Sequence, residues 1–204
     1  MSKYFRGYRM IHRLTSDNGS VPWVGDHLAL DLLNTQARGA NGTVEYWQSD
    51  DDVMGWLRQA GIAAPSACID RDSLLAEAMK LRSLARRLIE RHKEGIAEDL
   101  SELNIYLHAY LSSPHLERIS DGTLVLTYVT HGEGIDSLLG PIAQAVAQLL
   151  AEGDAGLIKQ CEHPDCILWF YDRTKAHRRR WCSMAVCGNR YKAAQFRKKS
   201  QAHD

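Results

Sequence analysis

Four of the five cysteines form two evenly spaced pairs in the last quarter of the sequence. Cys161 and Cys166 are separated by four residues, fifteen residues follow, and Cys182 and Cys187 repeat the four-residue gap. A short loop can bring two thiolates to one side of a tetrahedron, and a second pair closes it. Because four sulfur ligands leave no open coordination position, the spacing predicts one structural Zn²⁺ and not a catalytic metal.

Other interpretations of these thiols remain open from the residues alone. Two disulfides would need an oxidising compartment, and an iron–sulfur cluster also takes four thiolates. His163 lies inside the first loop and His177 lies between the pairs, so either could replace a cysteine as ligand. Cys68 stands alone before a turn, and we expect it to be a small buried apolar residue.

Positive charge is concentrated around the cysteines. The 204-residue chain has no formal net charge, yet residues 171–200 hold ten Lys and Arg and a single acid, Asp172. An acidic body with a basic segment indicates a polyanion as partner, because guanidinium groups on a rigid frame can clamp phosphates. The residues expected to contact nucleic acid are Arg173, Lys175, Arg178, Arg179, Arg180, Arg190, Lys192, Arg197 and Lys198.

The same residues allow two plainer roles. The charge could be a solvated surface, or it could partly offset the anionic four-thiolate centre. Trp169, Phe170, Tyr171 and Trp181 interleave with the charge and could stack on bases, but in so small a module we favour a core role for Trp169 and Phe170.

Periodicity and turn signals predict the elements that must position these groups. Residues 23–35 alternate in part and predict a strand, and residues 36–46 predict a loop. Helices are expected over 49–61, from 72 or 73 to Gly95, over 96–111, and over 136–154 with an entry at Pro141. Residues 115–131 predict a hairpin with its turn at Asp121 and Gly122, and a last helix should begin near Cys187.

The stretches CEHPDC and DRTKAHRRRWCSMAVCGNRYKAAQFRKK closely resemble the CGNR zinc-finger family, named from the tetrapeptide at residues 187–190. The resemblance implies that the four paired cysteines are the ligands. HLALDLLNT, DDVMGWLRQAGI, LRSLARRL and IAQAVAQLL resemble the ABATE domain, which precedes the finger in a family of predicted stress-induced transcription regulators of bacteria. Together, the two resemblances cover roughly residues 23–199.

We therefore expect an α+β fold, with a mostly helical N-terminal domain that holds a small β-sheet and a small C-terminal treble-clef-like zinc module. The expected parts are a flexible extension at residues 1–22, an ABATE-like domain at 23–155, and a CGNR-type zinc finger with a basic C-terminal helix at 156–204. Within the CGNR motif, Gly188 should permit a close approach or a sharp turn. Asn189 should cap the helix, and Arg190 is either structural or a contact to nucleic acid.

Polar residues of the N-terminal domain suggest a second site. Asp31, Asn34 and Arg38 cluster at the end of the expected strand, and Arg82 and Arg86 lie one turn apart on a helix. They could form a pocket for a small anion or acid. A structural ion pair between Asp31 and Arg82 is the simpler interpretation.

These features favour a regulator over an enzyme, since no catalytic motif rises above chance. We find no secretory signal and no apolar run long enough to span a membrane, so we expect a cytoplasmic protein. The expected function is a zinc-binding transcription regulator that contacts DNA through its finger, with an N-terminal domain that senses a small molecule or forms a homodimer. The alternative is a finger that docks RNA or protein.

Overall fold

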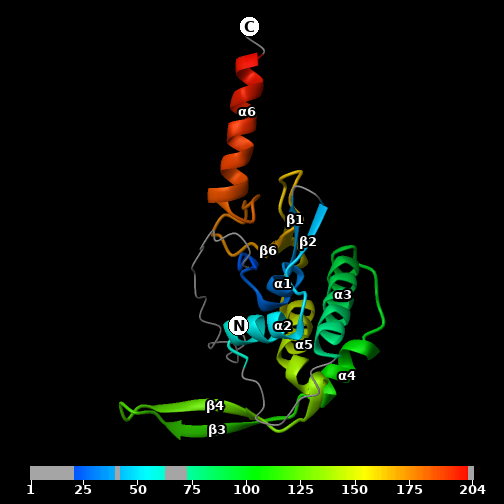
Figure 1. Cartoon of the computed structure of the whole chain (residues 1–204), viewed down its shortest axis with the longest axis vertical. Helices are drawn as coiled ribbons and strands as arrows, with labels where there is room; N and C mark the ends of the chain where they lie inside the picture. Colours follow the sequence, from blue (N-terminus) through cyan, green and yellow to red (C-terminus); the bar gives the residue numbers. More distant parts are fainter. Residues whose placement is uncertain (1–20, 40–41, 63–72, 202–204) are drawn as a thin grey trace. The chain divides into compact units, whose positions relative to one another are not determined.

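The computed structural model describes residues 21–39, 42–62 and 73–201, and Figure 1 labels most of its helices and strands. The described residues form two compact units. Residues 47–148 make the first, which we call the helical unit. Residues 21–46 and 149–201 make the second, which we call the zinc unit. The predicted flexible extension and Cys68 lie outside the described residues.

The helical unit contains α2 (Asp50–Gln59), α3 (Leu74–Lys93), α4 (Ser101–Ala109) and most of α5 (Gly134–Glu152). The helices predicted over 49–61 and 72–95 are confirmed. Ser49 begins α2 with a capping box, in which its hydroxyl accepts from the Asp52 amide and the Asp52 carboxylate accepts from the Ser49 amide. Gly61 and Gly95 follow α2 and α3 with φ of 76° and 71°, the left-handed conformation that ends helices.

The core of the helical unit is formed by the apolar faces of α2, α3 and α5. Trp47 and Trp56 meet edge to face with ring centroids 5.4 Å apart, and the buried Arg82 places its guanidinium 5.4 Å from the Trp47 ring. A cation over an aromatic face is stabilised by the ring quadrupole, so Arg82 has a structural contact within its own unit.

A hairpin of β3 (Ser112–Arg118) and β4 (Leu124–Thr130) completes the helical unit. The predicted turn is confirmed, with Gly122 at φ 87°. Two boundaries were wrong. The helix expected over 96–111 is shorter, and Pro141 lies inside α5 instead of at its start.

The zinc unit contains α1 (Leu28–Leu33), β1 (Gln36–Gly39), β2 (Gly42–Glu45), β5 (Ile158–Gln160), β6 (Trp169–Tyr171) and α6 (Asn189–Gln201). The strand predicted over 23–35 was wrong, because its centre is the helix α1. All six residues of α1 are buried. The partial alternation of apolar and polar residues therefore does not separate a buried face from an exposed one. The loop predicted over 36–46 is in fact the antiparallel hairpin β1–β2, in which Ala37 pairs with Val44.

The expected class is confirmed: helices combine with small two-stranded sheets, and a zinc-finger-like module forms near the C-terminus. One described helix, α5, has the length and mean hydropathy of a membrane span. Half of that stretch is buried inside the structure. Core helices of globular proteins can have the same length, hydropathy and partial burial.

Candidate zinc and nucleic-acid site

The four paired cysteines meet at one point of the zinc unit. Their Sγ atoms all lie within 4.8 Å of one another, with Cys166 and Cys182 3.7 Å apart and Cys182 and Cys187 3.5 Å apart. Sulfurs 2.3 Å from a tetrahedral zinc would be about 3.8 Å apart. The site therefore fits one structural zinc bound by Cys161, Cys166, Cys182 and Cys187.

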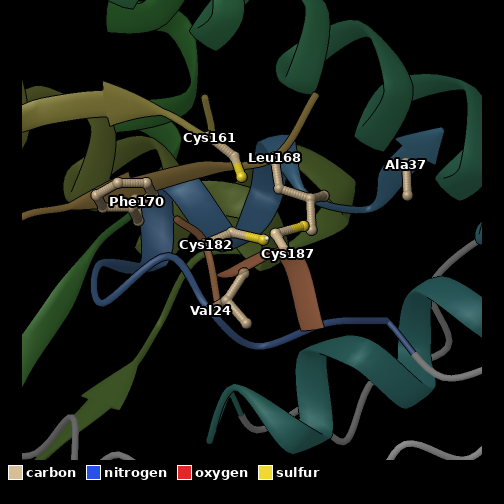
Figure 2. Close-up of a cluster of buried hydrophobic side chains, with 7 residues drawn as sticks. All are labelled: Val24, Ala37, Cys161, Leu168, Phe170, Cys182 and Cys187. Carbon is tan, nitrogen blue, oxygen red and sulfur yellow. Dashed lines mark hydrogen bonds between the residues drawn. The ribbon is translucent and has the colours of Figure 1, made fainter. Parts of the chain in front are cut away.

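Local backbone structure brings each pair together. The Cys161 amide donates to the Leu168 carbonyl (2.9 Å) directly after β5, and the Cys166 amide donates to the His163 carbonyl (2.9 Å), which closes the first loop. Cys182 precedes one turn of π-helix (Met184–Gly188) that contains Cys187. Figure 2 shows the sulfurs of Cys161, Cys182 and Cys187 inside a cluster with Val24, Leu168 and Phe170.

The thiol geometry argues against two of the alternatives that the sequence left open, the disulfides and a histidine ligand. All four cysteines are free, and sulfurs more than 3 Å apart are far beyond the roughly 2.05 Å of a disulfide bond. The ligand cluster contains neither His163 nor His177. His163 accepts instead from the Asp165 amide at 3.2 Å.

Without metal, the crowded thiols share their protons unequally. Hydrogen bonds from Cys166, Cys182 and Cys187 hold the pKa of Cys161 well below its ordinary value. The pKa of Cys182 is raised, mainly because its proton is held by the hydrogen bond to Cys161. Zinc binds thiolates, so metal binding must release the remaining protons and becomes stronger as pH rises.

Asp172, the single acid in the basic segment, is wholly buried and organises the loop between the pairs. One carboxylate oxygen accepts from Lys159 Nζ (2.7 Å) and the Arg179 amide (2.9 Å), and the other accepts from the Thr174 amide (3.1 Å) and hydroxyl (2.6 Å). Burial alone would raise the pKa of Asp172, but these bonds outweigh it and hold the pKa below its usual range.

Arg179 makes several contacts within the zinc unit. Its guanidinium pairs with the Asp26 carboxylate and donates to the carbonyls of Val24 (3.0 Å), Trp181 (3.0 Å) and Cys182 (2.6 Å). The same group lies 4.2 Å from the Phe170 ring centroid. Through the contacts to Asp26 and Val24, Arg179 joins the finger to residues 24–26.

Residues 24–35 complete the finger through further contacts. The buried Asn34 side chain donates to the Trp169 carbonyl (2.9 Å) and accepts from the Trp169 amide (2.8 Å), as a neighbouring strand would. The Tyr171 amide donates to the Gly25 carbonyl (2.8 Å), and the Gly25 amide donates to the Asp31 carboxylate (2.7 Å). The zinc module is thus built from two distant parts of the chain.

His27 lies in this same contact region. Its Nδ1 accepts from the Ala29 amide (3.2 Å) at the start of α1, and its ring lies 6.3 Å from that of Tyr171. Burial, and secondarily the positive charge of Arg173, lowers the pKa of His27 to about 4. The imidazole is therefore neutral at pH 7.

The CGNR tetrapeptide divides into structural residues and one free residue. Cys187 is a ligand. Gly188 has no left-handed φ, and its missing Cβ leaves room for Met184 Sδ and for Trp181, whose Cδ1 would lie 3.2 Å from a Cβ there. Asn189 donates to the Ala185 carbonyl (3.1 Å), and Arg190 is exposed and has no partner among the described residues.

The other basic residues also fall into two groups. The Arg173 Nε donates to the Asp26 carbonyl (2.9 Å), and Arg180 pairs with Glu162 (2.5 Å) and lies 4.9 Å from the Trp181 ring centroid. The second group has no hydrogen-bond or ion-pair partner in the described part of the chain. It comprises Lys175, Arg178, Arg190, Lys192, Arg197 and Lys198.

The residues of the predicted small-molecule pocket are divided between the units. Asp31, Asn34 and Arg38 belong to the zinc unit, where Asp31 and Asn34 hold backbone groups and Arg38 is exposed. Arg82 and Arg86 belong to the helical unit. The pocket stays a prediction.

Family comparisons agree with this geometry. Residues 26–153 match the ABATE family, described as "Putative stress-induced transcription regulator", and residues 158–200 match the CGNR zinc finger. Neither is an enzyme family. No curated protein matches the chain.

Proposed function

Because the chain belongs to the ABATE family and carries a CGNR zinc finger, we propose that it is a bacterial, cytoplasmic transcription regulator that binds DNA through the zinc unit. The contacts would come from the six cations without partners: Lys175, Arg178, Arg190, Lys192, Arg197 and Lys198. Arg173, Arg179 and Arg180 add positive charge, but their side chains hold the finger together.

The observation that carries this proposal is that α6 is exposed and that most of its cations have no partner among the described residues. The helix has no buried residue, and four of its cations have no partner in the described residues. Within the described residues nothing covers this helix or pairs with these four charges, so they are available to an external partner. Phosphates would provide the missing partners and release counterions.

The placement of the α6 charges suits a groove. Residues seven apart share a helix face, so Arg190 and Arg197 share one face and Lys192 lies on the opposite side. A helix in the major groove has a phosphate backbone on each side. Cations on both sides therefore suit a helix that enters the groove better than one that lies on a flat anionic surface.

The test is a salt titration of binding to a pool of random duplex DNA. We compare the wild-type chain with Arg190→Gln/Arg197→Gln/Lys198→Gln. Each lost phosphate contact should reduce the slope of log affinity against log salt by about 1. The variant should therefore bind more weakly and with a slope reduced by up to about 3.

The matched control is Lys80→Gln/Arg87→Gln/Arg91→Gln on α3, which removes the same charge from the helical unit. Its binding should stay near that of the wild type. Equal losses in both variants would mean that only net charge matters, and unchanged binding in the α6 variant would overturn the proposed contacts. Sequencing of the bound DNA shows whether one sequence is enriched.

A role on single-stranded RNA is favoured by one feature. A cavity of about 510 Å³ is lined by Thr174, Arg178, Arg179, Arg180, Trp181 and Met184. An arginine-rich hollow beside an indole could receive an unstacked base. Competition between duplex DNA and single-stranded RNA distinguishes the two functions, and Trp181→Leu should weaken only the second.

The ABATE region would supply regulation by sensing a small anion or by forming a homodimer. Burial lowers the pKa of Arg86; the Glu90 charge opposes this effect, and the nearby Arg82 charge adds to it. Two close, desolvated cations are a suitable receptor for a carboxylate or phosphate. Thermal-shift screening with such anions should raise the melting temperature of the wild type, and the increase should vanish in Arg86→Gln.

A further inference from the structure

The β3–β4 hairpin exposes an unusual amount of apolar surface. Leu116 and Leu126 are directly opposed in the register, and they are 61% and 60% exposed. Leu124, two residues before Leu126, shares that face and is 53% exposed. A two-stranded hairpin is only marginally stable in water without additional strands or a cover, so this surface indicates an interface.

The two edges of the hairpin differ in a way that identifies which one is available. β3 carries Pro114, His115, Glu117 and Arg118, and proline and charge are the features that protect edge strands from further pairing. β4, LVLTYVT, has neither. Within the described residues this sheet contains only β3 and β4, so the outer backbone groups of β4 face no third strand there.

We propose that β4 pairs antiparallel with β4 of a second copy of the chain and forms a four-stranded sheet in the order β3–β4–β4–β3. Because β4 carries no charge, self-pairing brings no like charges together. The arrangement also closes on itself, since both outer edges become β3, which is already protected. An isologous two-fold contact of this kind stops at the dimer.

The register of such a pair follows from the length of β4. Overlap of all seven residues places the two-fold axis at Thr127, so Val125 of one copy is opposite Val129 of the other. β-branched pairs across strands are favourable. The two Leu126 side chains then become diagonal neighbours, and the leucine faces of the two hairpins join into one surface.

This interface goes beyond the proposed DNA contact and does not depend on it, because no residue of the zinc unit takes part. It would present two fingers to a DNA site with two half-sites. The test of the dimer uses no nucleic acid, so the proposed dimer and the proposed DNA contact can be refuted independently of each other.

The test is sedimentation of the full-length, zinc-loaded chain over a concentration series. The wild type should dimerise. Leu126→Lys places two like charges near the two-fold axis and should raise the dissociation constant at least about tenfold. Leu116→Lys is the matched control, since it lies opposite Leu126 on the same face with the same exposure but on the outer strand. It should change the constant by less than about threefold.

A mixture of Leu126→Lys and Leu126→Glu should restore dimerisation as a heterodimer. A monomeric wild type would overturn the proposal, and so would a dimer that neither lysine variant weakens. Equal weakening by Leu116→Lys and Leu126→Lys would also overturn it, because it indicates that the leucine faces pack together without pairing of β4. Circular dichroism verifies that each variant is folded. Amide hydrogen exchange of the wild type needs no variant: protection of β4 should rise with concentration, and its absence also overturns the pairing.

Discussion

At the scale of single residues, similar charges in the zinc unit have different roles. Arg178 and Arg179 are neighbours, yet Arg178 has no partner among the described residues and Arg179 pairs with Asp26 and three carbonyls. Charge density alone therefore overstates the surface that remains for a ligand. Asp172 shows most clearly that sequence can mark a structural residue. It is the single acid among ten cations, and it is buried and hydrogen-bonded through both carboxylate oxygens.

His27 should make stability depend on pH. Its pKa of about 4 lies below the ordinary 6.5, so the unfolded chain binds the proton more readily. Its stabilising effect is complete above pH 6.5 and is lost as pH falls toward 4. Between pH 7.5 and 5 the free energy of unfolding should fall by about 1–2 kcal/mol from this group alone.

His27→Asn isolates this effect, because asparagine can still cap α1 but does not titrate. Denaturant melts at both pH values measure the free energy of unfolding. Loss of zinc from protonated thiols affects both proteins equally, so the difference between them reports His27. Identical pH slopes would show that the histidine is not buried in its neutral form.

The ligands could be predicted from sequence because their chemistry is encoded in local spacing. The Cys-x4-Cys repeat needs no distant information. The structural role of Arg179 could not be predicted, because its carboxylate partner, Asp26, is 153 positions away. The same holds for Asn34, whose partner Trp169 is 135 positions away.

At the scale of elements, zinc holds together pieces that are too short to be stable alone. β5 and β6 have three residues each, and one π-helical turn carries Cys187. Such pieces bury little surface, so metal binding must supply much of their folding free energy. Helices α2 and α3, by contrast, have long apolar faces and end at left-handed glycines, α2 also begins with a capping box, and both were correctly predicted.

Cys182→Ser should therefore unfold the finger but leave the helical unit folded. Metal analysis should find one zinc per wild-type chain and less than one in the variant. NMR spectra should lose the dispersed signals of residues 158–190 and retain those of α2 and α3. A variant with full zinc and an unchanged spectrum would refute the four-cysteine site. Cys161→Ser should behave in the same way.

The sequence did not predict elements that are buried on all faces or that are very short. α1 is buried on every side, so its sequence shows no helical stripe, and its six residues are too few for a clear period. The hairpin β1–β2 has strands of four residues, and its glycines and Asn41 were interpreted as a loop.

At the scale of the whole molecule, the compact units and the family regions divide the chain differently. The ABATE match begins at residue 26, whereas residues 21–46 are grouped with 149–201 in the zinc unit. The finger is therefore not a separate appendage. Part of the region that matches ABATE supplies its hydrogen bonds.

Asn34→Ala should weaken the finger without touching a ligand. The change leaves the Trp169 amide and carbonyl without their partner, and buried unpaired groups cost about 1–3 kcal/mol each. We expect a loss of about 2–4 kcal/mol in the free energy of unfolding of the zinc unit. Calorimetry measures it. An unchanged unfolding transition would show that residues 24–35 do not support the finger.

The split construction of the zinc unit also affects how the protein is made. Residues 47–148 are continuous and can fold as soon as they leave the ribosome. Residues 21–46 emerge before this segment but contact residues 149–201, which emerge after it. At about 5–20 residues per second, the intervening segment takes roughly 5–20 s to synthesise. During that interval the apolar α1 has no finger to contact, so nascent chains should depend on chaperones until zinc and the last cysteine arrive.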